Sequence, residues 1–168
     1  TPAAISKITG ELIADGLVRE GESVPADGGI GRREVLIELE TRAYCALGVL
    51  INIGQAVLSA VWLDGSVIFS EEVALPRPAP ADETVSKLWA RLRELASDAG
   101  IPDEKLLGIG VAVRGLTDPE KSIARNTLGA LDAEDYPLAE AFSKVSGLPA
   151  VMDNNVRALF AAQMFEAR

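Results

Sequence analysis

The sequence predicts an α/β protein of two parts, a small helix-and-hairpin unit over residues 1–40 and an α/β lobe over residues 41–168. Three observations predict this fold class. The chain opens on a helix pattern with clear end signals, followed by two strand patterns around a glycine-rich loop. Apolar strand patterns joined by tight turns come next. Beyond them, helix and strand patterns alternate, as they do in α/β lobes.

The first element is a helix that begins at residue 2. Thr1 suits the N-cap, Pro2 suits the first helical position, and Gly16 suits the left-handed residue that follows a helix. Its apolar residues recur at helical spacing, so we expect them to form one buried stripe: Ile5, Ile8, Leu12 and Ile13. The opposite face keeps Ala4, Ser6, Lys7 and Thr9 accessible.

After this helix, residues 17–21 and 34–39 can pair as two strands around a loop at residues 22–33. The tip of the loop carries Arg32 and Arg33. An arginine pair on such a loop suits contact with phosphates or insertion into a narrow minor groove. The alternative is a flexible, solvated turn between two domains.

The lobe begins with an antiparallel meander. Strand patterns at residues 46–51 and 57–63 flank a tight turn at residues 52–55, and Asp64-Gly65 marks a second turn into residues 66–73. A proline-rich break at 75–80 precedes the remaining elements. These are a helix at 82–99 closed by Gly100, a strand at 106–113 that we expect to be covered on both faces, a short strand at 122–126, a helix at 137–146, a strand at 150–152 and a helix at 155–166.

Composition limits the classes of function. An apolar content of 48% in 168 residues suffices for one core and a small accessory unit. The net charge is −9, of which residues 1–33 carry −1 and the rest −8, so any DNA contact is local to the first unit. There is no run long enough for a membrane span, and the single Cys45 excludes an internal disulfide, so we expect a cytoplasmic protein.

Three segments carry a family resemblance. Residues 47–65 keep the shape of a sugar-kinase phosphate hairpin, residues 108–118 resemble a GIGIAVPGPVD segment, and residues 151–158 resemble a V-x-x-N-D-A-x-A segment. Together with the N-terminal unit, they make the chain similar to the ROK family, which contains sugar kinases and sugar-responsive repressors. The resemblance implies a partial winged helix-turn-helix followed by the first lobe of an actin-like, RNase H-like ATPase fold.

The resemblance also implies partners and sites. Operator DNA would meet the early residues of the first helix and the wing: Ala3, Ala4, Ser6, Lys7, Arg32 and Arg33. A sugar or sugar-phosphate effector would bind at Asn154, Asn155 and Arg114, and the protein would be a homodimer or tetramer. Two alternatives stay open at the ligand residues: Asn154 could serve only as a helix N-cap, and Arg114 could be a solvated turn residue.

Two departures from the kinase pattern argue against catalysis. Leu50 stands where the kinases carry an Asp that positions Mg²⁺, and a leucine offers no oxygen ligand. Asn155 stands where they carry the catalytic base, and a carboxamide is no base near neutral pH. We therefore expect a regulator without kinase activity and without catalytic residues. The alternatives are a divergent sugar kinase and a lobe that serves only for dimerisation.

The resemblance further implies that the chain is part of a longer protein. A helix-turn-helix needs helices before the recognition helix, and ROK proteins continue into a second lobe. That second lobe usually holds a zinc site built from His and closely spaced Cys. This sequence has no His and one Cys, so we expect no cofactor or metal in these residues and place a structural zinc in the second lobe.

Overall fold

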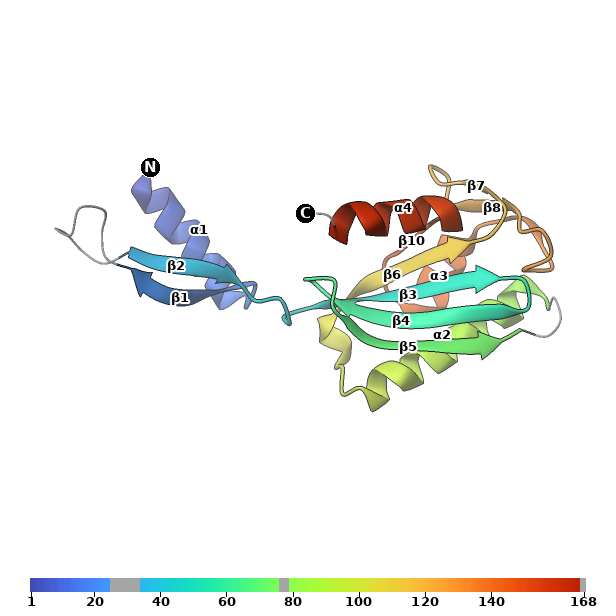
Figure 1. Cartoon of the computed structure of the whole chain (residues 1–168), viewed down its shortest axis with the longest axis horizontal. Coiled ribbons are helices and arrows are strands. Elements are labelled where there is room, and N and C mark those ends of the chain that lie inside the picture. Colours follow the sequence, from blue (N-terminus) through green and yellow to red (C-terminus); the bar gives the residue numbers. More distant parts are fainter. Residues whose placement is uncertain (25–33, 76–78, 167–168) are drawn as a thin grey trace. The chain divides into compact units, whose positions relative to one another are not determined.

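The computed structural model describes residues 1–24, 34–75 and 79–166, and its path is drawn in Figure 1. The chain divides into two compact units, Thr1–Ala43 and Tyr44–Arg168, and each is described by itself. Among the described helices, none is both long enough and apolar enough to cross a membrane.

The first unit contains a helix, α1 (Pro2–Ala14), and an antiparallel ribbon of β1 (Val18–Val24) and β2 (Glu34–Leu39). The helix, its two end signals and the pairing of the strands are confirmed, although Thr1 makes no side-chain capping bond. Gly16 has a φ of 70°, the left-handed conformation expected after a helix. β1 continues past the predicted end with an irregular register between Glu20 and Ser23. Arg32 and Arg33 lie outside the described residues.

The apolar stripe predicted on α1 is present, but the prediction that it is buried was wrong. Ile5 is 67% exposed and Ile8 is 56% exposed, whereas Leu12 is half-buried. The ribbon of this unit is two strands wide and leaves most of the stripe uncovered. The spacing therefore predicted which residues share a face of the helix, but it does not show whether another element packs against that face.

The second unit is built on a five-stranded mixed sheet in the order β10-β6-β3-β4-β5 (Figure 1). Its strands are β3 (Cys45–Asn52), β4 (Gln55–Trp62), β5 (Val67–Ala74), β6 (Leu106–Val113) and β10 (Ala150–Asn154). β10, β6 and β3 run parallel, and β3, β4 and β5 form the predicted antiparallel meander. The tight turn is Ile53-Gly54, with Gly54 at a φ of 80°.

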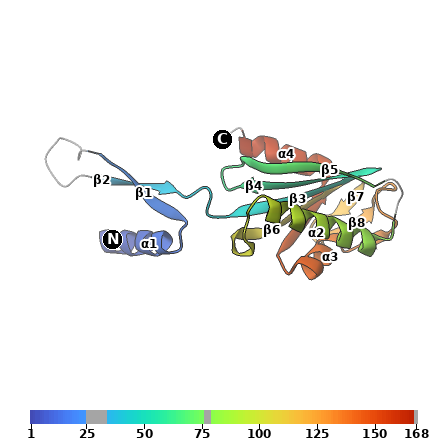
Figure 2. The same cartoon turned by 90° about the horizontal axis from the view of Figure 1, so that it is seen from below.

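The core lies on one face of this sheet, under α2 (Ala81–Asp98) and α3 (Leu138–Ser146), whereas α4 (Asn155–Glu166) lies on the other face (Figure 2). Val85, Leu88, Leu92 and Ala96 of α2 are buried as predicted, and Trp89 and Leu95 are half-buried. Cys45 is a core residue, as expected, and burial raises the pKa of its thiol, which disfavours the reactive thiolate.

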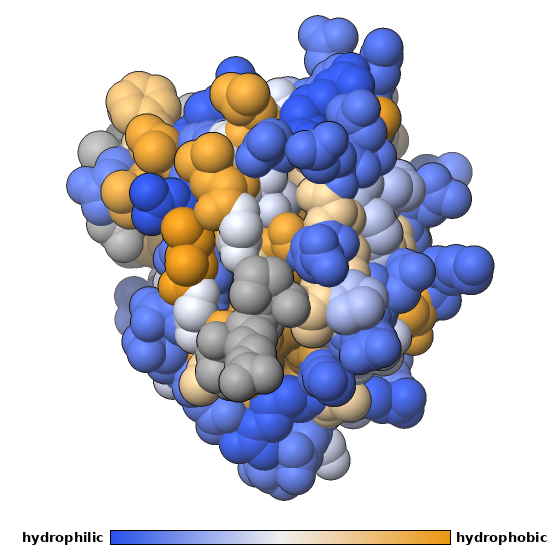
Figure 3. Space-filling view, turned by 90° about the vertical axis from the view of Figure 1, so that its right-hand side faces the viewer, coloured by the Kyte–Doolittle hydropathy of each residue, from blue (hydrophilic) through white to orange (hydrophobic). Residues whose placement is uncertain are grey.

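The expectation that β6 is covered on both faces was wrong. Ile109, Val111 and Val113 are buried toward α2 and α3, but Gly110 on the α4 side is exposed. α4 leaves a groove between itself and the sheet, and its outward residues Leu159 and Phe160 are 64% and 67% exposed. Figure 3 shows the side of the molecule that lies at the right in Figure 1. Apolar surface gathers in one part of this view, and polar surface covers most of the rest.

A second, three-stranded sheet follows β6. It contains β7 (Leu116–Asp118), β8 (Ile123–Asn126) and β9 (Glu134–Tyr136), and β8 is the short strand that the sequence predicted. β7 and β9 were not predicted. Arg125 joins the three strands, because its guanidinium donates to Asp118 at 2.8 Å and to Asp135 at 2.9 Å.

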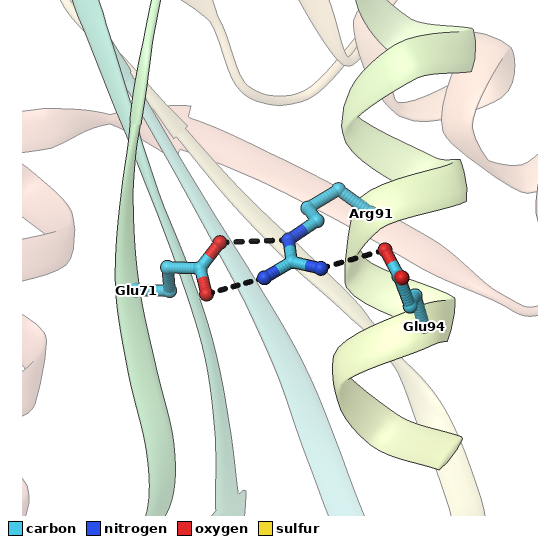
Figure 4. Close-up of polar contacts among 3 residues, drawn as sticks. All are labelled: Glu71, Arg91 and Glu94. Carbon is cyan, nitrogen blue, oxygen red and sulfur yellow. Dashed lines mark hydrogen bonds and ion pairs between the residues drawn. The ribbon is translucent and has the colours of Figure 1, made fainter. Parts of the chain in front are cut away.

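An ion-pair cluster joins β5 to α2 (Figure 4). Arg91 binds Glu71 through two hydrogen bonds of 2.7 Å each, and its third nitrogen lies 2.6 Å from Glu94. This hydrogen bonding to Arg91 lowers the pKa of Glu71. A bidentate pair of this kind fixes both side chains more firmly than a single contact.

We expect replacement of Glu71 by glutamine to lower the free energy of unfolding near neutral pH. The free energy of unfolding of the variant should also depend less on pH in the acidic range. A carboxyl whose pKa is lowered by folding contributes stability above its unfolded pKa and loses it as pH falls through the folded pKa. The urea midpoints of wild type and Glu71→Gln should therefore differ at about pH 7, and the difference should shrink as pH falls through the lowered pKa of the Glu71 carboxyl. Glu72→Gln, an exposed neighbour on the same strand, is the control. A constant difference across this range would contradict the assignment.

Candidate functional site

The candidate ligand residues meet where two parallel strands end. β6 ends at Val113 and is followed by Arg114, and β10 ends at Asn154 and is followed by Asn155, the first residue of α4. Val113 pairs with Asn154 in the parallel register. The carboxyl ends of parallel strands are where ligands gather in open α/β sheets. The fold thus places Arg114 at the same edge of the sheet as Asn154 and Asn155, which lie far from it in the sequence.

Asn154 has two structural contacts. Its Oδ1 accepts the backbone N–H of Val156 at 2.9 Å, so it caps α4. Its Nδ2 donates to the backbone oxygen of Gly115 at 2.7 Å, which joins the start of α4 to the loop after β6. The capping role that the sequence left open is therefore present, together with a second bond that the sequence did not predict.

Gly115 lies unusually close to a neighbouring segment. Its φ is 116°, and a Cβ atom at this position would lie 2.0 Å from the backbone oxygen of Asn126 and 2.9 Å from Cα of Thr127. These are backbone atoms, which cannot turn aside as a flexible side chain can. Only glycine fits here without moving the chain.

The segment that Gly115 approaches forms a hollow beside the candidate site. Asn126 Oδ1 accepts the N–H of Leu128 at 2.8 Å, and buried Thr127 both donates to and accepts from the backbone of Leu131. The hollow has a volume of about 420 Å³ and is lined by Asn126, Thr127, Gly129, Leu131, Asp132, Ala133 and Glu134. The sequence did not single out these residues, although an Asn-x-x-Gly run is a recognisable turn signal.

Leu50 faces the side of the sheet that carries α4. It pairs in register with Ala112, which pairs with Asp153, so the three side chains share one face. Leu50 also lines the groove between the sheet and α4, together with Gly48, Val49, Val57, Ser59, Val61, Val67, Ser70, Gly110, Ala112, Ala158 and Ala162. The wall of this groove is thus mostly apolar.

Asp153 is the carboxylate in this row, and it is already paired. Its oxygens lie 3.0 and 3.1 Å from Nε of Arg157, and Oδ1 also accepts the N–H of Asn154 at 2.7 Å. Within the described residues, no cluster of three or more His, Cys, Asp or Glu side chains could hold a metal ion.

Arg114 and Asn155 have side chains available for a ligand. The backbone N–H of Arg114 bonds to Ile51 at 3.1 Å, while its side chain is exposed. Asn155 is half-buried. Among the described residues, neither side chain has a hydrogen-bonding or ionic partner. A guanidinium and a carboxamide together offer donors and an acceptor, which suit hydroxyl and anionic groups.

The residues predicted to face DNA are accessible on α1. Ala3, Ala4, Ser6 and Lys7 are all exposed, and Nζ of Lys7 lies 3.8 Å from Glu11 in an exposed pair. Such an exposed pair contributes little to stability, so Lys7 can exchange this partner for a phosphate at small cost.

Sequence comparison finds relatives among bacterial regulators. The DNA-binding transcriptional dual regulator NagC of Escherichia coli is 28% identical over 167 residues, which are 98% of this chain and 39% of NagC. The repressor Mlc of the same species is 27% identical over 159 residues, 94% of this chain and 38% of Mlc. No family model matches the chain. This chain is a homologue of the ROK-family regulators.

Solved structures share the fold. A ROK-family transcriptional regulator described as a homologue of Escherichia coli Mlc superposes with a TM-score of 0.73 at 22% identity, over 94% of this chain and 39% of that one. A ROK-family glucokinase from Streptomyces griseus superposes with a TM-score of 0.55 at 20% identity, over 66% of this chain and 33% of that one. The chain thus spans about two fifths of its regulator relatives, and ROK kinases share the fold of its lobe.

Proposed function

We propose that the protein is a sugar-responsive transcriptional repressor of the ROK type. In this proposal the first unit is the recognition helix and wing of a winged helix-turn-helix, and residues 41–168 are the first lobe of an effector-binding domain. The observation that carries it is the likeness to the regulators NagC and Mlc, which extends across both units. Effector binding alters the affinity for operator DNA through a homodimer or tetramer.

We further propose that the lobe binds its effector without phosphorylating it. Leu50 contributes an apolar side chain where a metal-positioning carboxylate would be required, and Asn155 cannot take a proton from a sugar hydroxyl. Asp153 does not replace either group, because it is paired with Arg157. Phosphoryl transfer depends on positioning and charge stabilisation, and both groups that would supply them at this site are replaced.

The effector class follows from the two available side chains. Asn155 can exchange hydrogen bonds with sugar hydroxyls, and Arg114 can pair with a phosphate or another anion. A relative in Escherichia coli O6:H1 is named as the N-acetylglucosamine repressor, and the glucokinase structure contains glucose. Glucose, N-acetylglucosamine and glucose 6-phosphate are therefore suitable probes for this chain.

A divergent sugar kinase is the second candidate, because the lobe shares its fold with the ROK glucokinase. We expect sugar-dependent ADP release by the full-length protein to equal the blank without enzyme, for each of the two unphosphorylated probe sugars. A turnover near about 1 s⁻¹ or above, which is typical of kinases, would establish the second candidate instead. The same preparation should bind its operator, and an effector sugar should change that affinity. Absence of DNA binding would contradict the repressor proposal.

A further inference from the structure

We infer that Asn154 is a positioning residue: it ties the loop after β6 to the start of α4, and so sets the distance between Arg114 and Asn155. The inference rests on the proposed function of this site, and it gives different roles to two adjacent asparagines that were both predicted to bind the effector. In this assignment Asn155 contacts the effector, whereas Asn154 acts through the groups that it holds.

The first support is the hydrogen bonding of the Asn154 amide. Its oxygen caps α4 at Val156, and its nitrogen donates to Gly115 at 2.7 Å. Each polar atom of this half-buried side chain thus already has a partner in the protein. A ligand that used either atom in place of its present partner would leave a backbone group of the site without a hydrogen bond.

The second support is the confinement of the loop that Asn154 holds. The N–H of Arg114 bonds to Ile51 on β3, and Gly115 lies against Asn126 with no space for a Cβ atom. The Gly115 carbonyl is held by Asn154 from the third side. Because the loop is fixed at three points, the backbone that carries the Arg114 side chain is already ordered. Less conformational entropy is therefore lost when a ligand binds.

The third support is the contrast with Asn155. Its side chain is half-buried, and it has no hydrogen-bonding partner among the described residues. The two neighbours therefore differ in what a substitution removes. Replacing Asn154 loosens the site, while replacing Asn155 removes a ligand-binding group from a site that keeps its shape.

The two bonds of Asn154 can be separated by substitution. Asn154→Asp keeps an oxygen to accept the N–H of Val156, and a carboxylate is favourable at a helix N-terminus. It replaces the donor that faces the Gly115 carbonyl with a second acceptor, so the tie to the loop is removed. Asn154→Ala removes both bonds. Asn155→Leu is the matched comparison at the next position.

The experiment combines hydrogen exchange without ligand and calorimetry on the full-length protein. In Asn154→Asp we expect faster exchange in the peptide that covers residues 113–118, with a thermal midpoint close to that of wild type. Asn155→Leu should leave this exchange unchanged. Affinity for the best of glucose, N-acetylglucosamine and glucose 6-phosphate should fall about tenfold in Asn154→Asp, the range for a polar partner left unsatisfied.

A positioning role also predicts the pattern across ligands. Asn154→Ala, which removes both bonds without adding a charge, should weaken each bound probe by a similar factor, whereas a direct contact would spare analogues that lack the contacted hydroxyl. Unchanged exchange at residues 113–118, or a weakening confined to sugars with one particular hydroxyl, would overturn the inference. If wild type binds none of the probes, the proposed function fails, and the exchange data still decide whether Asn154 holds the loop.

Discussion

Replacing Gly115 with alanine is expected to destabilise the second unit by about 2–4 kcal/mol, one of the largest effects available outside the core. The new Cβ would lie 2.0 Å from the backbone oxygen of Asn126, so one of the two segments must move. The φ of 116° adds strain, because side chains rarely adopt it. Urea denaturation of wild type and Gly115→Ala measures the difference.

Gly129→Ala is the matched control for this substitution. Gly129 also has a positive φ, at 85°, but no atom lies within 4 Å of its added Cβ. It should therefore cost only the backbone strain, about 1 kcal/mol. Equal destabilisation by the two substitutions would mean that Gly115 does not lie against Asn126 in solution. If Gly115→Ala stays folded, its effector affinity should also fall, because the displaced loop carries Arg114.

The site was predictable from the sequence where its signals are local. Asn154 precedes a helix pattern, and capping depends on residues within one turn, so its role as a cap could be considered beforehand. The helical spacing of α2 likewise placed Val85, Leu88 and Leu92 on the buried face. In both cases the sequence signal lies within a few positions along the chain.

The remaining parts depend on contacts between distant residues. The bond from Asn154 to Gly115 joins positions 39 apart, and no local pattern encodes it. β7 and β9 have three residues each, which is too short for a periodic pattern to be recognised. The exposed stripe of α1 is the opposite case: its spacing was interpreted correctly, but burial depends on what packs against it.

The second large effect concerns DNA. We expect the double substitution Arg32→Ala/Arg33→Ala in the full-length protein to weaken binding to operator and unrelated DNA alike. If the wing binds phosphates, the slope of log K against log salt should fall by about 0.9 for each phosphate that is no longer neutralised in each half-site. A salt titration of both proteins measures this. Arg19→Ala is the control for the removal of charge, because Arg19 is already paired with Glu38 at 2.9 Å.

The helix should behave differently from the wing, and this difference tests the whole assignment of the first unit. Ser6 and Lys7 are exposed in the N-terminal half of α1. In helix-turn-helix proteins the N-terminal residues of the recognition helix contact base edges in the major groove. Contacts to base edges carry sequence information, whereas phosphate contacts do not. Substituting Ser6 should therefore change the preference among operator sequences while leaving the salt slope close to that of wild type. An unchanged salt slope in the double arginine variant would mean that Arg32 and Arg33 do not contact DNA phosphates. An unchanged preference among operator sequences in the Ser6 and Lys7 variants would mean that α1 does not recognise bases.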